Sequence, residues 1–209
     1  MAALFPPFFR ELAQAAGHSS SEATALWGYV TAGGLLLVAL VAPILGAVAD
    51  VAGGRKKFLA VFAGLGILLT ALFATLGPAA WRTAGLLFMG ANFGFAASII
   101  FYESLLPSLA KGKDMDRLST QAYGLGYAGG GLLLILNLLW VMHPDWFGMP
   151  DTGFAIRVSF VSVAVWWGIF SLPLLRHVPE PPVVGAAASG PVVSQGFRRL
   201  ARTFAEISK

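Results

Sequence analysis

A short polar stretch separates two long apolar runs at residues 46–57, Gly-Ala-Val-Ala-Asp-Val-Ala-Gly-Gly-Arg-Lys-Lys. The runs on either side, residues 23–49 and 58–81, contain no charged side chain. Each run exceeds the about 20 apolar residues that a helix needs to cross the core of a bilayer. The polar segment is therefore expected to be a tight loop between two membrane helices. Its three consecutive cations, at positions 55–57, indicate the cytoplasmic side, because basic loops stay inside.

The composition of the 209-residue chain indicates a membrane protein. Apolar residues make up 57% and charged residues 11% of the chain, whereas a soluble domain carries about 25% charge. The net charge of +4 arises from loop cations that membrane orientation explains, and no basic patch for nucleic acid stands out. The chain contains no cysteine, which excludes disulfides, thiolate metal sites and thiol catalysis. The lipid bilayer is thus an expected partner and nucleic acid is not.

Further uncharged runs predict the other membrane helices. Residues 1–9 are apolar but too short to span a bilayer, so they are expected to be the outer end of a truncated first helix; a short interfacial anchor is the alternative. Residues 10–22 are polar enough for an external loop. Complete helices are expected at residues 23–49, 58–81, 83–102, 118–142 and 158–175. The predicted fold is an all-α membrane bundle of five full transmembrane helices and a truncated first helix.

The positions of the cations set the orientation of these helices. With the first basic loop inside, only Arg10, Arg82 and Arg157 of the 14 lysines and arginines would lie outside. This asymmetry makes the reverse orientation unfavourable. Residues 111–117 would form a second cytoplasmic loop, and residues 176–209 a cytoplasmic linker that begins a central loop.

The loop itself carries a spaced pattern of glycine and charge. Gly46, Asp50 and Gly53, followed by Arg55 and Lys56, read as Gly-x-x-x-Asp-x-x-Gly with basic residues after it. Taken by itself, this pattern could serve topology only, with the carboxylate as a helix cap. It also resembles the signature loop of the major facilitator superfamily, which lies between helices two and three.

That resemblance implies a gating role for the loop. In the superfamily the loop lies at the boundary of two six-helix halves, and its aspartate helps to switch the cytoplasmic gate. Val51 and Gly54 depart from the family pattern, because they stand where basic residues are common.

Three further stretches narrow the resemblance: residues 5–9 (Phe-Pro-Pro-Phe-Phe), 101–107 (Phe-Tyr-Glu-Ser-Leu-Leu-Pro) and 124–131. They look like a bacterial branch related to fungal vacuolar amino-acid effluxers. The resemblance implies export of an amino acid or similar small solute through the inner membrane of a bacterium. Superfamily members have about twelve helices in two pseudo-symmetric halves, with the substrate near the midplane. This chain would therefore be the N-terminal half of a secondary transporter working by alternating access.

Such a half requires a partner, either a missing C-terminal half or a second copy of the chain. A half-transporter that acts as a homodimer is thus one alternative. A truncated membrane protein that transports nothing is the other.

Several polar side chains could lie on a solute path. Glu103 is a carboxylate in a membrane helix, which is costly and suggests function; it could bind a proton or an amine, or instead reach the interface and pair with a loop lysine. Asn92 and Asn137 could contact solute or form hydrogen bonds between helices. Tyr123 and Tyr127 share a helix face and could line the cavity or simply pack.

Paired glycines indicate where helices approach closely. Gly90 with Gly94, and Gly126 with Gly130, have the four-residue spacing that favours helix contact in lipid. The second pair is expected where the two halves meet. Residues 124–129 also match Gly-x-Gly-x-x-Gly, but no strand precedes them, so no dinucleotide site is predicted. With isolated histidines and no nucleophile–base pair, neither a metal, a cofactor nor an enzyme activity is expected.

Overall fold

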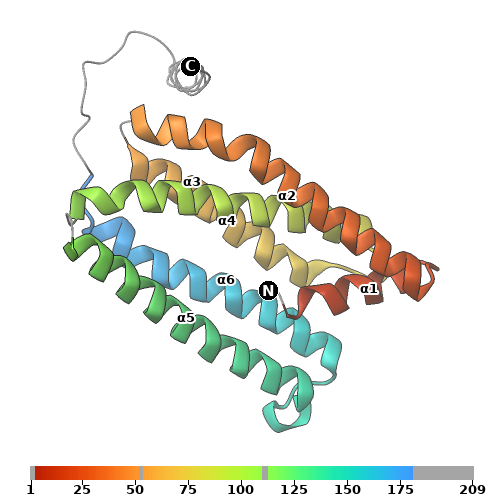
Figure 1. The fold of residues 1–209 in the computed structure, drawn as a ribbon. Helices are drawn as coiled ribbons and strands as arrows, with labels where there is room; N and C mark the ends of the chain where they lie inside the picture. Colours follow the sequence, from red (N-terminus) through yellow and green to blue (C-terminus); the bar gives the residue numbers. More distant parts are fainter. Residues whose placement is uncertain (1–2, 52–53, 110–112, 181–209) are drawn as a thin grey trace.

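The computed structural model describes residues 3–51, 54–109 and 113–180, and this part of the chain is helical without a strand (Figure 1). Five of its helices are long and apolar enough to cross a membrane. The helices are α1 (Phe5–Ala15), α2 (Ser20–Val51), α3 (Arg55–Leu72), α4 (Trp81–Leu109), α5 (Lys113–Met142) and α6 (Thr152–His177), with short 3-10 turns η1 (Phe73–Thr75) and η2 (Pro144–Phe147). The prediction of an all-α membrane protein with five full helices and a shorter first helix is confirmed.

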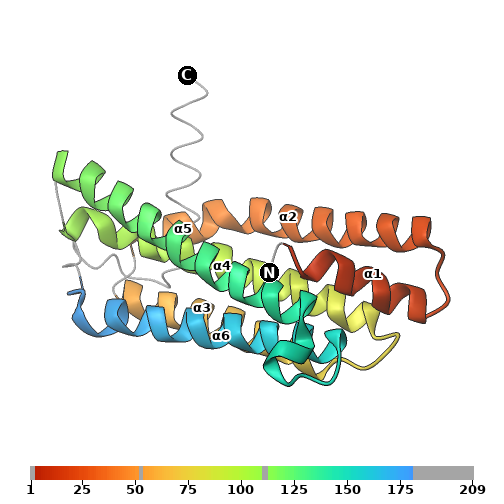
Figure 2. The ribbon, with the colours of Figure 1, turned by 90° about the horizontal axis from the view of Figure 1, so that it is seen from below.

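The helices pack side by side in an order that differs from their order in the chain. α4 packs against both α2 and α3, α3 packs against α6, and α6 packs against α5. Figure 2 shows α2 on one side of the bundle and α3 with α6 on the other, with α4 between them. Because α5 contacts mainly α6 and touches α4 only sparsely, the bundle is open between α4 and α5.

Many large apolar side chains are exposed on the outer surface of the membrane helices, as expected for contact with lipid. On α2, Leu35, Leu36 and Leu40 are each about 60% exposed or more, at 59%, 60% and 65%. A soluble protein rarely presents contiguous apolar surface of this kind. The bundle is therefore suited to a bilayer rather than to water.

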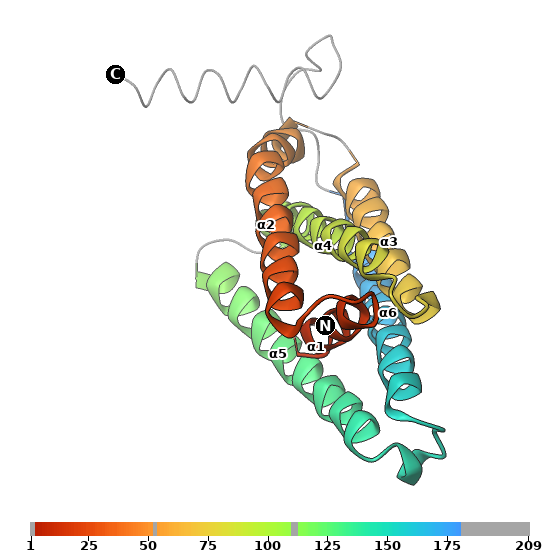
Figure 3. The same cartoon turned by 90° about the vertical axis from the view of Figure 1, so that its right-hand side faces the viewer.

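The shortest helix, α1, is held in the bundle by aromatic side chains. Phe5 and Phe9 are fully buried, and the Phe5 ring lies 4.6 Å from that of Phe73 and 4.8 Å from that of Phe88, measured between centroids. Phe8 contacts the Phe160 ring of α6 at 5.2 Å. Seen from another side, α1 lies between α2 and α6 (Figure 3). Aromatic pairs of this kind contribute about 0.5–1.5 kcal/mol each beyond their buried area.

The expected external loop over residues 10–22 is wrong at both ends, because α1 continues to Ala15 and α2 begins at Ser20. The two prolines at positions 6 and 7 stand in the first turn of this helix. Proline is tolerated there, since the first amide groups have no acceptor within the helix. The prolines therefore open α1, and the apolar residues after them place one face of the helix in the core.

Other helices extend beyond their uncharged runs. α4 begins at Trp81 rather than after it and reaches Leu109, and α5 begins at Lys113. α6 begins at Thr152, where the Asp151 carboxylate accepts a hydrogen bond from the Phe154 amide at 2.8 Å. An uncharged run marks the bilayer core, whereas a helix continues into the interface, where water and headgroups solvate its charged residues. The predicted loops were accordingly too long.

Glycines allow α3 and α4 to meet backbone to backbone. A Cβ atom at Gly94 would lie 2.8 Å from the Phe62 carbonyl oxygen and 2.8 Å from the Gly66 nitrogen. At Gly90 a Cβ would lie 2.7 Å from the Leu69 side chain. Small residues let membrane helices approach in this way, and this contact is the most extensive one in the bundle.

Candidate functional site

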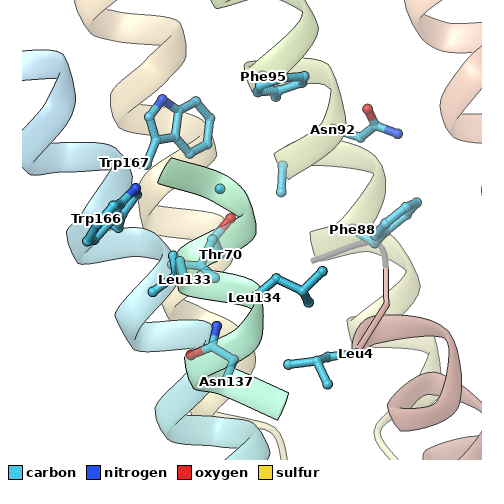
Figure 4. A pocket seen from close by; sticks show the side chains of 13 residues that line it. Leu4, Thr70, Phe88, Asn92, Phe95, Leu133, Leu134, Asn137, Trp166 and Trp167 are labelled. Atoms are coloured by element: carbon cyan, nitrogen blue, oxygen red, sulfur yellow. The ribbon is translucent and has the colours of Figure 1, made fainter. Parts of the chain in front are cut away.

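A cavity of about 490 Å³ lies in the opening between α4, α5 and α6. Its volume falls within the range of about 300–1,000 Å³ that is typical of small-molecule sites. Its lining residues are Leu4, Thr70, Phe88, Ala91, Asn92, Phe95, Gly130, Leu133, Leu134, Asn137, Val163, Trp166 and Trp167. None of them carries a formal charge, so the cavity is an apolar chamber with a few polar groups (Figure 4).

Aromatic rings form two opposing walls of the cavity. Phe88 and Phe95 come from α4, and Trp166 and Trp167 come from α6 on the other side (Figure 4). The Phe95 and Trp167 rings meet edge to face with centroids 5.8 Å apart. Trp167 reaches this position because Gly66 of α3 has no side chain: a Cβ there would lie 2.3 Å from Trp167 Cη2. A glycine of one helix thus sets where the wall of another helix stands.

Two amides supply most of the polar character. Asn137 of α5 is 2% exposed, and its Oδ1 accepts a hydrogen bond from the Ser162 hydroxyl of α6 at 2.9 Å. Asn92 of α4 is half-buried and lies near Gly34 of α2, with Nδ2 3.9 Å from where a Cβ of that glycine would be. Of the five predicted path residues, these two asparagines therefore line the cavity, and Asn137 also joins two helices.

A hydrogen-bonded pair of polar side chains joins α4 to α5 outside the cavity. The Tyr123 hydroxyl donates to Glu103 Oε1 at 3.1 Å, and both side chains are exposed. Glu103 follows Asn92 by three helical turns, which places it on the same face of α4 and about 16 Å further along the helix. Tyr123 precedes Gly130 by two turns and shares its face of α5. The pair thus lies on the faces that line the cavity, displaced toward the ends where α2 finishes and α3 begins.

Of the remaining residues of α5 that the sequence singled out, Gly130 lines the cavity, whereas Tyr127 and Gly126 do not. Tyr127 is 79% exposed and does not line the cavity. A Cβ atom at Gly126 or at Gly130 would meet nothing within 4 Å. This stretch of α5 therefore has open space beside it within the chain, unlike Gly90 and Gly94 of α4.

The loop motif lies at the far end of the bundle from α1. Gly46 and Asp50 belong to the last two turns of α2, whereas Gly53 falls outside the described residues. Arg55 and Lys56 are the first two residues of α3. The Arg55 guanidinium donates from Nη1 to the backbone oxygen of Ser104 in α4 at 3.0 Å, so the motif ties α3 to the end of α4.

Gly54 explains one departure of this loop from the superfamily pattern. Its φ of +81° lies in the left-handed region, which glycine adopts readily and other residues adopt at a cost of roughly 1–2 kcal/mol. A basic residue at this position would strain the turn into α3. The backbone conformation of this particular loop therefore favours glycine at position 54.

The four aromatic residues of the cavity, which form its walls, were not predicted: Phe88, Phe95, Trp166 and Trp167. Aromatic residues in a membrane helix carry no local signal that separates a cavity wall from a lipid-facing surface. The only hint was indirect, because Gly66 leaves room for a large ring on a neighbouring helix. That relation appears only once the helices are packed.

Comparisons with known proteins agree with this architecture. The model of a family described as "Vacuole effluxer Atg22 like" matches residues 10–115 and 111–209. The chain is 30% identical over 206 residues to "Uncharacterized MFS-type transporter YxiO" of Bacillus subtilis (strain 168), covering 98% of this chain and 48% of the relative. It is 26% identical over 196 residues to "Autophagy-related protein 22" of Coccidioides immitis (strain RS), covering 68% and 32% of the two chains.

A third relative is "Autophagy-related protein 22-1" of Penicillium rubens, 24% identical over 216 residues, with 72% of this chain and 36% of the relative covered. No solved structure matches the chain significantly. The chain spans about half the length of the bacterial relative and about a third of the fungal ones. The chain belongs to the Atg22-like vacuole effluxer family of the major facilitator superfamily and corresponds to the N-terminal half of such a transporter.

Proposed function

We propose that this chain is the solute-binding N-terminal half of a secondary transporter that exports an amino acid or a similar small metabolite by alternating access. The observation that carries the proposal is the cavity between α4, α5 and α6, with aromatic walls and two amides. The similarity to an MFS-type transporter and to autophagy-related proteins of an effluxer family supports it.

The lining residues suggest how the solute is held. The amides of Asn92 and Asn137 can each donate two hydrogen bonds and accept at the carbonyl oxygen. Since Asn137 Oδ1 already accepts from Ser162, its amide nitrogen is the group that turns to the solute. Aromatic walls pack against the apolar part of the solute. Because no lining residue is charged, this half holds an uncharged portion, and Glu103 with Tyr123 offers a site for an amine or a proton further along the path.

The membrane orientation follows from the cations. We place the end of the bundle with Arg55, Lys56 and Lys57 on the cytoplasmic side of a bacterial inner membrane. The tail after α6 is then cytoplasmic, residues 176–209 form the start of the central linker, and residues 1–9 belong to the first membrane helix. In this arrangement the motif residues Gly46, Asp50, Gly53, Arg55 and Lys56 act at the cytoplasmic gate.

A second half, or a second copy of the chain, would complete the site. The open space beside Gly126 and Gly130 of α5 is where another helix can approach closely. Small residues at a helix surface favour such contacts in lipid. The cavity would then be enclosed between the two halves, near the bilayer midplane.

Binding of labelled solute tests the proposal. The purified full chain in proteoliposomes is offered a panel of radiolabelled neutral amino acids, and bound label is measured by scintillation proximity. We expect saturable binding of at least one probe. Asn92→Ala and Asn137→Ala should each lower the affinity for that probe roughly 2- to 12-fold, because each removes one amide hydrogen bond to the solute.

The matched control is Thr75→Ala. Thr75 is in η1, outside the cavity, and its hydroxyl donates a hydrogen bond to the Leu72 carbonyl oxygen. This variant should therefore bind solute like the wild type. If no probe binds, or if both asparagine variants bind as tightly as the wild type, the cavity is not the solute site. Where a probe does bind, its efflux from loaded proteoliposomes that contain both halves measures transport itself.

A further inference from the structure

The start of α3 is capped by a residue that is distant in the sequence. The backbone amides of Arg55 and Lys56 donate to the two carboxylate oxygens of Glu180, the second of these bonds being 3.2 Å long. The first amides of any helix lack an acceptor within the helix. Here the N-cap is Gly54, which has no side chain with which to supply one. Glu180, 125 residues later in the sequence, takes the place of the missing cap.

A contact of opposite sign runs the other way between the same two segments. The Lys56 ammonium donates from Nζ to the backbone oxygen of Val178 at 2.7 Å, and Val178 is the C-cap of α6. A helix N-terminus carries partial positive charge and a helix C-terminus partial negative charge. The Glu180 carboxylate at the start of α3 and the Lys56 ammonium at the end of α6 thus each lie at a helix terminus of opposite partial charge, which is a favourable electrostatic interaction.

The backbone around Glu180 limits how freely its carboxylate can move. Pro179 precedes it, and the sequence continues with Pro181 and Pro182. Proline fixes its own φ and pushes the residue before it toward extended conformations. Glu180 itself therefore has few accessible backbone conformations, so little backbone entropy is lost when its carboxylate accepts hydrogen bonds from the two amides.

We infer that Glu180 is a positioning residue that fastens the segment after α6 onto the loop motif at the start of α3. A displacement of that segment then changes the hydrogen bonds of Arg55 and Lys56 directly, with no rearrangement of the membrane helices. The functional part of this inference rests on the proposed gating role of the motif. The attachment of the segment does not depend on that role, because it consists of the hydrogen bonds from the Arg55 and Lys56 backbone amides to Glu180 and from the Lys56 ammonium to Val178.

Amide hydrogen exchange on the full chain in lipid nanodiscs tests the fastening. The peptide that covers the start of α3 is followed by mass spectrometry in the wild type and in Glu180→Ala. Losing a helix cap should speed exchange of the Arg55 and Lys56 amides roughly 5- to 30-fold. Glu11→Ala is the matched control, since Glu11 is an exposed carboxylate on α1 at the opposite end of the bundle; it should leave this peptide unchanged.

The absence of cysteine from the chain allows a rescue that separates charge from bulk. In Glu180→Cys, the new thiol is labelled either with an anionic sulfonatoethyl methanethiosulfonate or with neutral methyl methanethiosulfonate. We expect the anionic label to restore slow exchange at the start of α3 and the neutral label to leave it fast.

Two results would overturn the inference. One is equal exchange of the α3 peptide in the wild type and in Glu180→Ala. The other is faster exchange spread evenly over α1 and α4 as well, since the carboxylate would then support the fold in general. Neither readout depends on solute binding, so a failed binding assay and a failed exchange assay remain distinguishable.

Discussion

Gly94→Ala should destabilise the bundle by separating α3 from α4. The added Cβ would lie 2.8 Å from both the Phe62 oxygen and the Gly66 nitrogen, and 3.1 Å from the Gly66 Cα. All three are backbone atoms, which no rotamer change can move. Restoring ordinary contact at about 3.5 Å requires the helices to part by about 0.7 Å.

The magnitude follows from that separation. A gap of 0.5–1 Å forfeits a quarter to a half of the dispersion energy of each facing contact, and α3 with α4 forms the largest contact in the bundle. Overpacking of a core costs about 1–3 kcal/mol. We expect Gly94→Ala to lie at the upper end, at about 2–3 kcal/mol, because the clash is with backbone on a rigid helix.

Reversible unfolding in mixed micelles with increasing sodium dodecyl sulfate measures this free energy. Gly126→Ala is the control with the same chemical change, since a Cβ there meets nothing within 4 Å. Alanine is the better helix former by about 0.5–1 kcal/mol, so this variant should be as stable as the wild type or slightly more so. Equal unfolding free energies for Gly94→Ala and Gly126→Ala would refute the argument.

Three further substitutions test other parts of the structure. Phe5→Ala should lower the unfolding free energy by about 3–5 kcal/mol because it empties a fully buried site, whereas Tyr29→Ala, on the lipid-facing surface, should change it little in the same titration. Gly54→Ala should cost about 1–2 kcal/mol through its positive φ, seen as faster amide exchange in the first turn of α3. Tyr123→Phe removes the hydroxyl that donates to Glu103; unfolding should shift by less than about 1.5 kcal/mol, while solute efflux falls, and unchanged efflux would remove this pair from the path.

The membrane helices were predictable because their signal is local. Each apolar run is long enough to span the bilayer by itself, so the existence of α2 to α6 required no knowledge of packing. Their ends were less accurate: Trp81 opens α4 instead of closing α3, and α6 starts at Thr152. Charge marks where the bilayer core ends, but it does not mark where helical hydrogen bonding ends.

The candidate site likewise contains residues that the sequence could single out and residues whose surroundings depend on packing. Asn92 and Asn137 were singled out because an amide in a membrane helix is unusual, and both line the cavity. Tyr123 and Tyr127 were grouped by helical spacing, yet both are exposed and neither lines the cavity. Spacing places two residues on one face of a helix, but it cannot say what that face meets.

The sequence alone determined the membrane class, the five spans, the family and the positions of its loop motif, since all of these depend on runs and patterns of neighbouring residues. Tertiary structure decided which faces of α4, α5 and α6 enclose a cavity, and it placed Trp167 in the space left by Gly66. It also brought Glu180 to the amides of Arg55 and Lys56. Such contacts join residues from different helices, and they exist only when close packing has set the distance between those helices.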